Sequence, residues 1–134
     1  MGESSAKANG IEIAYEVIGD AKAPPMLLIM GLGAQMVLWE DGLCRMLVER
    51  GHRVIRFDNR DVGKSTHFHE AGLPDIASIM TAAFTGQALS APYELSDMAR
   101  DCVGLLDVLG IERADIVGAS MGGMIAQTLA IEHG

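Results

Sequence analysis

Five consecutive apolar residues, Met26 to Met30, constrain the fold more than any other segment of the sequence. A strand that is apolar at every position must be covered on both faces, as is typical of a central strand in a parallel sheet. Apolar residues then recur at helical spacing from about Gln35 to Arg50, and a second strand is expected over Val54 to Phe57. Strand, helix and strand in this order predict one right-handed βαβ unit. The apolar stripe of its helix comprises Met36, Trp39, Leu43, Met46 and Leu47.

An antiparallel hairpin is predicted before this unit. The dipeptide Asn9-Gly10 is typical of a type I′ turn, and Ile11, Ile13, Tyr15 and Val17 alternate with other residues after it. We expect this hairpin at one edge of the sheet.

The second half of the chain predicts a helix from Leu95 to Leu109, a short strand ending at Gly118 and a last helix from about Met121 to His133. Between the two halves, Ile76 to Tyr93 carries no charge and fits either a packed connection or a substrate-facing cover. The fold class is therefore α/β with three layers, a mostly parallel sheet and an N-terminal antiparallel hairpin. We expect residues 1–134 to form a single domain.

The helix predicted from Leu95 to Leu109 carries three aspartates that are expected on a solvated face: Asp97, Asp101 and Asp107.

Composition excludes several classes of function. The formal net charge of −8 repels phosphate backbones and anionic lipid, so neither nucleic acid nor a membrane surface is an expected partner. Cys44 and Cys102 lack metal-ligand spacing and are expected to be buried thiols in a reducing compartment. The N-terminus has neither a signal peptide nor a lipidation motif, so we expect a cytoplasmic protein.

A G-x-S-x-G sequence, Gly118 to Gly122, joins the predicted short strand to the last helix. Side chains two positions before and after Ser120 would collide with the neighbouring strand and helix, so glycine is needed at both places. Such a turn presents the serine Oγ at the end of the sheet, beside the positive end of the helix. There the Met121 N–H is a candidate donor to a developing oxyanion.

A second oxyanion donor is expected from the turn Met30-Gly31-Leu32-Gly33, which follows the first parallel strand. Glycine lets the backbone approach a reacting carbonyl, and the Leu32 N–H is the candidate donor. The alternative is that Gly31 and Gly33 only permit a tight turn.

The βαβ unit, the segment Asp58 to Ser65 and the serine turn together resemble the N-terminal half of an α/β-hydrolase, in particular the esterase-like branch that includes aclacinomycin methylesterase. The resemblance covers nearly the whole chain and implies a truncated α/β-hydrolase fold, with the cap and the C-terminal half absent. Met30 replaces the usual histidine of the first turn, and Asp61 replaces the first glycine of a D-x-R-G-x-G-x-S pattern. Because Ser120 stands where related dehalogenases and epoxide hydrolases place aspartate, the resemblance implies hydrolysis of carboxylic esters or related acyl substrates.

The base and acid of a catalytic triad are missing from the expected positions. In this fold both follow the serine along the chain, yet His133 would lie roughly 20 Å from Ser120 along its helix. His52 begins a strand at the opposite end of the sheet, and only the loop residues His67 and His69 follow a strand on the correct side. We therefore expect the chain alone to be inactive or incomplete. Its last strand should also have an unpaired edge, through which the chain could self-associate.

Two other functions fit parts of the sequence. Gly31-Leu32-Gly33, with Asp58 and Arg60 beyond the next strand, would suit an NAD(P)-binding Rossmann-type module. A non-catalytic interaction domain that keeps the hydrolase scaffold is the other alternative. The simplest interpretation of Asp58 and Arg60 is structural, as an ion pair or as loop hydrogen bonds. No metal or organic cofactor is implied, and the expected ligand is a small acyl compound.

Overall fold

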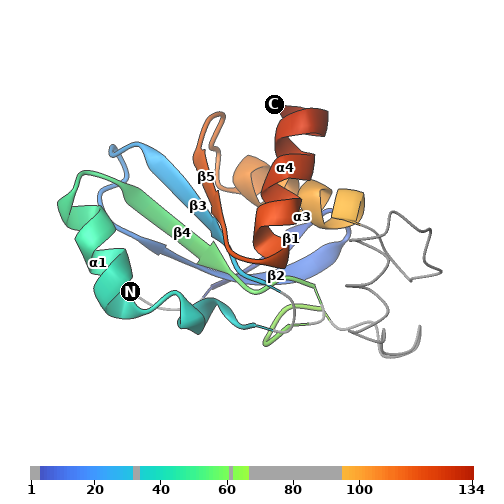
Figure 1. The fold of residues 1–134 in the computed structure, drawn as a ribbon, viewed down its shortest axis with the longest axis horizontal. Helices are drawn as coiled ribbons and strands as arrows, with labels where there is room; N and C mark the ends of the chain where they lie inside the picture. The colour runs from blue at the N-terminus through green and yellow to red at the C-terminus, as the bar shows by residue number, and fades with distance from the viewer. Residues whose placement is uncertain (1–3, 32–33, 61, 67–94) are drawn as a thin grey trace.

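The computed structural model describes residues 4–31, 34–60, 62–66 and 95–134. They form a mixed five-stranded sheet in the order β1-β2-β4-β3-β5 (Figure 1). The strands are β1 (Ser4–Ala8), β2 (Ile11–Ile18), β3 (Pro25–Ile29), β4 (Arg53–Phe57) and β5 (Asp115–Gly118). β3 is parallel to both of its neighbours, β4 and β5, while β2 is antiparallel to β1 and β4.

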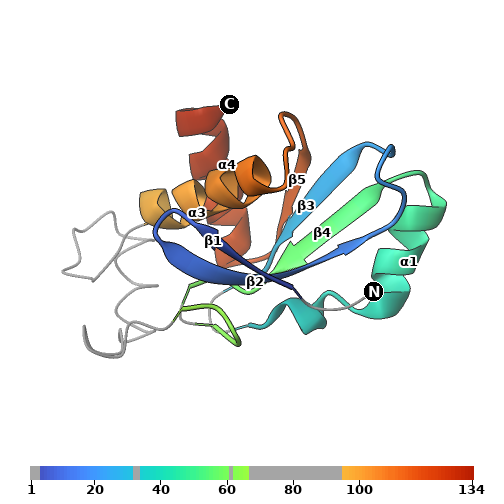
Figure 2. The same cartoon turned by 180° about the vertical axis from the view of Figure 1, so that it is seen from behind.

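The predicted hairpin is confirmed at the edge of the sheet, where β1 and β2 pair (Figure 2). Asn9 and Gly10 have φ angles of 50° and 79°, and a type I′ turn requires positive φ at both central residues.

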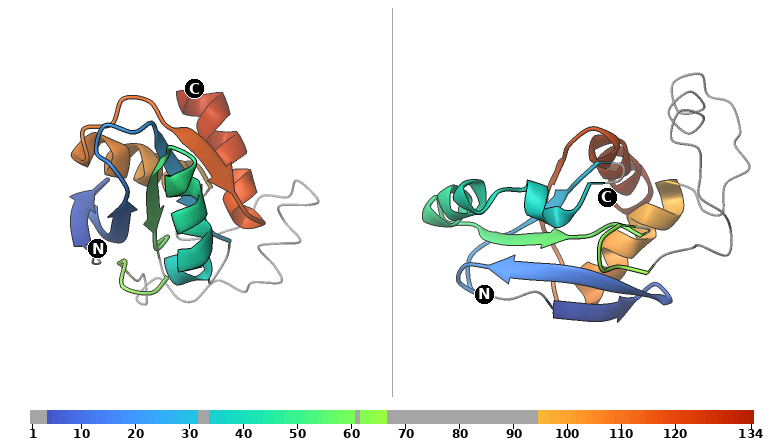
Figure 3. Two further views of the ribbon diagram at one scale, coloured as in Figure 1. Left: turned by 90° about the vertical axis from the view of Figure 1, so that its left-hand side faces the viewer. Right: turned by 90° about the horizontal axis from the view of Figure 1, so that it is seen from below.

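Helices cover both faces of the sheet, as the left panel of Figure 3 shows. One face packs against α1 (Asp41–Glu49), and the other against α3 (Leu95–Val108) and α4 (Met121–His133). In β3, Leu27 and Ile29 belong to the cluster under α3 and α4, whereas Leu28 belongs to the cluster under α1. All three side chains are fully buried, so the prediction of a strand covered on both faces is confirmed.

The helix predicted from Gln35 to Arg50 is wrong as a single element. The structure has a 3-10 helix, η1 (Met36–Leu38), and begins α1 at Asp41. The carbonyl of Trp39, between the two, accepts a hydrogen bond from Arg56 Nη1 at 2.5 Å. Arg56 also forms ion pairs with Glu16 and Asp41, so this buried cation fixes the chain where the helices separate.

The apolar stripe proposed for that helix is also partly wrong. Leu43 and Met46 are 40% and 57% exposed, while Cys44 is fully buried in the cluster under α1. The break before Asp41 changes which face of the helix meets the sheet. Both cysteines are free and buried, as expected.

Asp101 corrects the expectation that the aspartates of α3 lie on a solvated face. It is 2% exposed and forms a bidentate ion pair with Arg60, with N–O distances of 2.7 and 2.8 Å. Asn9 Nδ2 donates a third hydrogen bond to the same carboxylate at 2.9 Å. A buried carboxylate needs such partners, and here they tie α3 to the hairpin and to the loop after β4.

β5 lies at the edge of the sheet and pairs only with β3 within the described residues. Its Val117 is 39% exposed. The segment Ile76 to Tyr93 lies outside the described residues. No described helix has both the length and the apolar composition needed to cross a bilayer.

Candidate active site

The site lies at the carboxyl ends of β3 and β5. The chain leaves β3 toward α1 on one face of the sheet and leaves β5 toward α4 on the other. Ligands of open α/β sheets bind in the crevice where two neighbouring strands diverge in this way. Gly31 and Ser120, each two residues beyond its strand, both lie at this point.

Ser120 has φ of 56° and ψ of −122°, a backbone conformation that residues other than glycine rarely adopt. These angles match the first central position of a type II′ turn, and the N–H of Gly122 donates to the carbonyl of Ala119 at 2.9 Å, which closes the turn. Ser120 is exposed, and α4 begins at the next residue. The predicted strand, sharp turn and helix are therefore present.

The two flanking glycines have no room for a side chain. A Cβ on Gly118 would lie 2.2 Å from the carbonyl oxygen of Gly122, and a Cβ on Gly122 would lie 2.1 Å from the carbonyl oxygen of Ile29 in β3. By contrast, a Cβ on Gly123 would make only an ordinary contact, at 3.6 Å. The predicted collisions with the following helix and the neighbouring strand are both found.

Gly31 brings the loop after β3 against the serine. Its Cβ, if present, would lie 3.1 Å from Ser120 Cβ and 3.6 Å from Ser120 Oγ. The structure thus brings together two of the turns singled out in the sequence. Leu32, expected to donate the second oxyanion hydrogen bond, lies outside the described residues, as does Asp61.

The N-terminus of α4 is suited to receive negative charge beside Ser120. Its first turn contains no acidic residue. The N–H of Gly123 donates to the carbonyl of Ser120 at 2.9 Å, whereas no acceptor for the N–H of Met121 is found among the described residues. An N–H at a helix N-terminus, aligned with the helix dipole, stabilises an anion placed before it.

Asp58 and Arg60 have structural roles, as the simplest interpretation held. The Asp58 carboxylate accepts hydrogen bonds from the N–H groups of Met36 and Lys64, at 2.8 and 3.1 Å, and Arg60 pairs with Asp101. Neither side chain is therefore available for a ribose or a 2′-phosphate, which argues against the dinucleotide-binding alternative.

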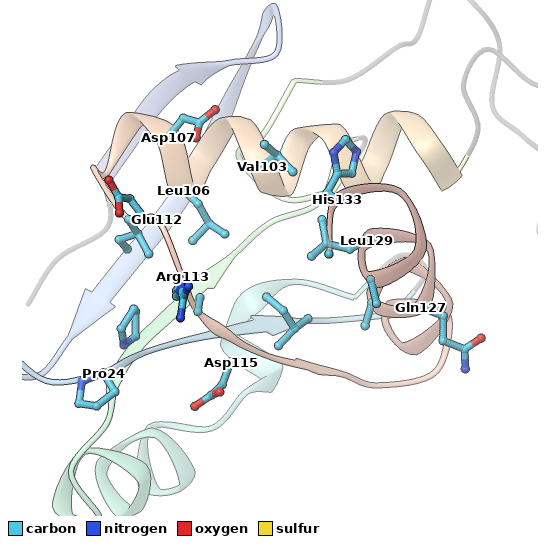
Figure 4. A pocket seen from close by; sticks show the side chains of 17 residues that line it. Pro24, Val103, Leu106, Asp107, Glu112, Arg113, Asp115, Gln127, Leu129 and His133 are labelled. Carbon is cyan, nitrogen blue, oxygen red and sulfur yellow. The ribbon is translucent and has the colours of Figure 1, made fainter.

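The described histidines, His52 and His133, both lie far from Ser120 along the sheet. His52 precedes the amino end of β4. His133 ends α4 and borders a hollow of about 1060 Å³ between α3, α4 and the start of β5 (Figure 4). Pro24 and Pro25, at the start of β3, line the same hollow. It is therefore separate from the candidate site, and neither histidine is placed to act as a base for Ser120.

His67 and His69 lie outside the described residues. Within the described part of the chain, no group of three or more His, Cys, Asp or Glu side chains could hold a metal ion.

Comparisons with known proteins agree with this architecture. A family model described as "alpha/beta hydrolase fold" matches residues 24–134. RutD of Variovorax paradoxus (strain S110), provisionally named a carbamate hydrolase, is 36% identical over 119 residues, which cover 89% of this chain and 37% of RutD. Rhodomycin D methylesterase DauP of Streptomyces sp. (strain C5) is 32% identical over 117 residues, which cover 87% of this chain and 33% of DauP.

Among solved structures, a hydrolase from Pseudomonas aeruginosa PA01 matches 98% of this chain and 41% of its own, with a TM-score of 0.76 and 29% identity. The chain spans about a third of the length of the two curated relatives.

Proposed function

Because the chain belongs to the alpha/beta hydrolase fold family, we propose that it carries the nucleophile and part of the oxyanion site of a serine hydrolase acting on carboxylic esters or related acyl substrates. The observation that carries this proposal is the backbone of Ser120, held at φ 56° between two glycines that have no room for a side chain. Backbone strain of this kind is retained where it orients a functional group.

Each residue of the site has a proposed role. Ser120 Oγ attacks the acyl carbon, and its proton passes to a base as the new C–O bond forms. The N–H groups of Met121 and Leu32 stabilise the oxyanion of the tetrahedral intermediate. Gly31 leaves space beside Oγ for the substrate carbonyl. The alcohol leaves with a proton returned by the base, and water then hydrolyses the acyl-enzyme.

The names of two relatives support an acyl substrate, since one is a methylesterase and the other is provisionally a carbamate hydrolase. In both kinds of reaction a nucleophile attacks an sp² carbonyl carbon. The present chain would use Ser120 in the same way. Its two free, buried thiols are consistent with a reducing compartment such as the cytoplasm.

Among the described residues no histidine lies close enough to act as a base for Ser120, so the test supplies the base from solution. A fluorophosphonate probe in the presence of imidazole, which supplies a base in solution, tests the nucleophile directly. We expect peptide mass spectrometry to find the label on Ser120, at a rate that rises with imidazole concentration and falls to background in Ser120→Ala. Labelling of Ser120 no faster than of the exposed Ser5 would contradict the proposal and favour the non-catalytic interaction domain.

A further inference from the structure

Two consecutive residues after β4 hold the two ends of the loop that carries Gly31. Asn59 Nδ2 donates to the carbonyl of Met30 at 2.9 Å, and Asp58 Oδ1 accepts from the N–H of Met36 at 2.8 Å. Both side chains are almost completely buried, at 2% and 3% exposure. The loop after β3 is thus fixed where it leaves the strand and where it enters η1.

The bond to Met30 has a direct geometric effect at Ser120. A peptide unit is planar, so fixing the carbonyl of Met30 fixes the plane that ends at the Cα of Gly31. That Cα faces Ser120, since a Cβ built on it would point to within 3.6 Å of Ser120 Oγ. Asn59 therefore controls, through one peptide plane, how closely the loop approaches the serine hydroxyl.

We propose that Asn59 and Asp58 are positioning residues of the acyl site, which hold the Met30-Gly31 peptide at its working distance from Ser120. This inference rests on the proposed function and extends it to residues that touch neither substrate nor nucleophile. A displacement of about 1 Å in a group that orients a reaction costs on the order of a hundredfold in rate. Loss of the Asn59 bond should therefore slow the reaction of Ser120 more than an equal loss of folding stability elsewhere in the same loop.

Ser65 provides a matched control in the same loop. It is also 2% exposed and makes two hydrogen bonds: Oγ donates to the carbonyl of Asp58 at 2.5 Å and accepts from the N–H of Ala14 at 2.9 Å. The bond with Ala14 connects the loop to β2, and the bond with Asp58 lies within the loop, so neither reaches the segment that carries Gly31. Ser65→Ala and Asn59→Ala each remove a buried polar group, so both should lower stability by a similar amount.

The experiment compares Asn59→Ala, Asn59→Ser and Ser65→Ala, each first shown to be folded by circular dichroism. NMR measures the carbonyl carbon shift of Met30 and the amide shifts of Gly31. Fluorophosphonate labelling in imidazole measures the reactivity of Ser120. We expect both Asn59 variants to move these shifts and to slow labelling about tenfold to hundredfold, while Ser65→Ala leaves the shifts and the labelling rate near wild type.

The two readouts separate the inference from the proposed function. Shifts that move no further in the Asn59 variants than in Ser65→Ala would overturn the positioning role. Shifts that move without any loss of labelling rate would also overturn it. If the wild-type chain is not labelled at Ser120, the nucleophile assignment fails, while the Met30 carbonyl shift still decides whether Asn59 sets the loop.

Discussion

The backbone of Gly31 lies directly against the side chain of Ser120. A Cβ added to Gly31 would come within 3.1 Å of the Cβ of Ser120, closer than side chains normally approach. Two loops that are distant in the sequence therefore meet at one hydroxyl, and the space beside it exists because position 31 has no side chain.

Gly31→Ala should block this space. We expect labelling of Ser120 to fall at least tenfold, because the added methyl occupies the place proposed for the substrate carbonyl, with a stability loss of about 1 kcal/mol for the close contact. Gly42→Ala is the control, because a Cβ at Gly42 in α1 would meet nothing within 4 Å. Equal labelling rates in the two variants would contradict the assignment of the space to substrate.

Ser120→Gly should stabilise the protein. A non-glycine residue at φ 56°, ψ −122° is strained, and glycine adopts such angles at little cost. We expect the free energy of unfolding in urea to rise by roughly 1 kcal/mol in Ser120→Gly and to stay near wild type in Ser120→Ala, which keeps the strain. No gain from glycine would mean that the turn is relaxed.

Neighbouring glycines of α4 should respond in opposite directions to alanine. Gly122→Ala places a methyl 2.1 Å from the carbonyl oxygen of Ile29, so the turn must move, and we expect a loss of about 3 kcal/mol or more. Gly123→Ala meets only an ordinary contact and should gain about 0.5–1 kcal/mol from helix propensity. Thermal or urea unfolding of the pair measures the difference, and similar values would refute the steric argument.

The outer edge of β5, which has no partner strand in the described part of the chain, should make the chain self-associate. Edge strands with exposed apolar residues pair with other strands, and Val117 is 39% exposed. We expect wild type to sediment as dimers or larger species, and Val117→Lys to shift it toward monomer. Ile131→Lys, on the exposed side of α4, is the control and should not change the distribution. A monodisperse wild-type monomer would contradict this prediction.

Stability should decline in alkaline solution because of Cys102. Burial raises the pKa of this thiol far above its ordinary value of 9.0, and the nearby Asp101 raises it further. Below pH 9 the thiol is protonated in both folded and unfolded chains, so it contributes no pH dependence. Above pH 9 only the unfolded chain loses the proton, so the free energy of unfolding falls by roughly 1 kcal/mol per pH unit.

Cys102→Ala should remove the part of the alkaline decline in unfolding free energy that this thiol causes. Unfolding in urea at pH 8, 9 and 10 measures it, and an unchanged slope in the variant would exclude the thiol as its source. In this variant Cys44 still causes a smaller alkaline decline, because burial raises the pKa of its thiol and the nearby Arg56 offsets part of that rise.

Local patterns predicted most of the described elements, because hairpin, strand and turn signals depend on short-range sterics. Asn9-Gly10 specified its turn type, and Gly118 and Gly122 specified the sharp bend around Ser120. What the sequence did not reveal depends on long-range pairing. The ion pair between Arg60 and Asp101 joins residues 41 positions apart, so α3 alone gave no reason to expect a buried aspartate.

The interruption between η1 and α1 was missed for the same reason. Arg56, on a strand formed later in the chain, binds the carbonyl of Trp39, and nothing in the helical spacing from Gln35 onward signals that contact. Asn59 was likewise not identified, because the hydrogen bond that its amide donates depends on where the Met30 carbonyl points in three dimensions.

The contacts that shape the serine turn involve main-chain atoms: Gly118 against Gly122, and Gly122 against Ile29. Side chains at the intervening positions, such as Ala119, take no part in these two contacts. Instead, the side chains of Ala119 and Met121 pack into the clusters on the two faces of the sheet. The place of the hydroxyl is therefore set by the main chain, while the side chains before and after it hold the turn to both layers of helices.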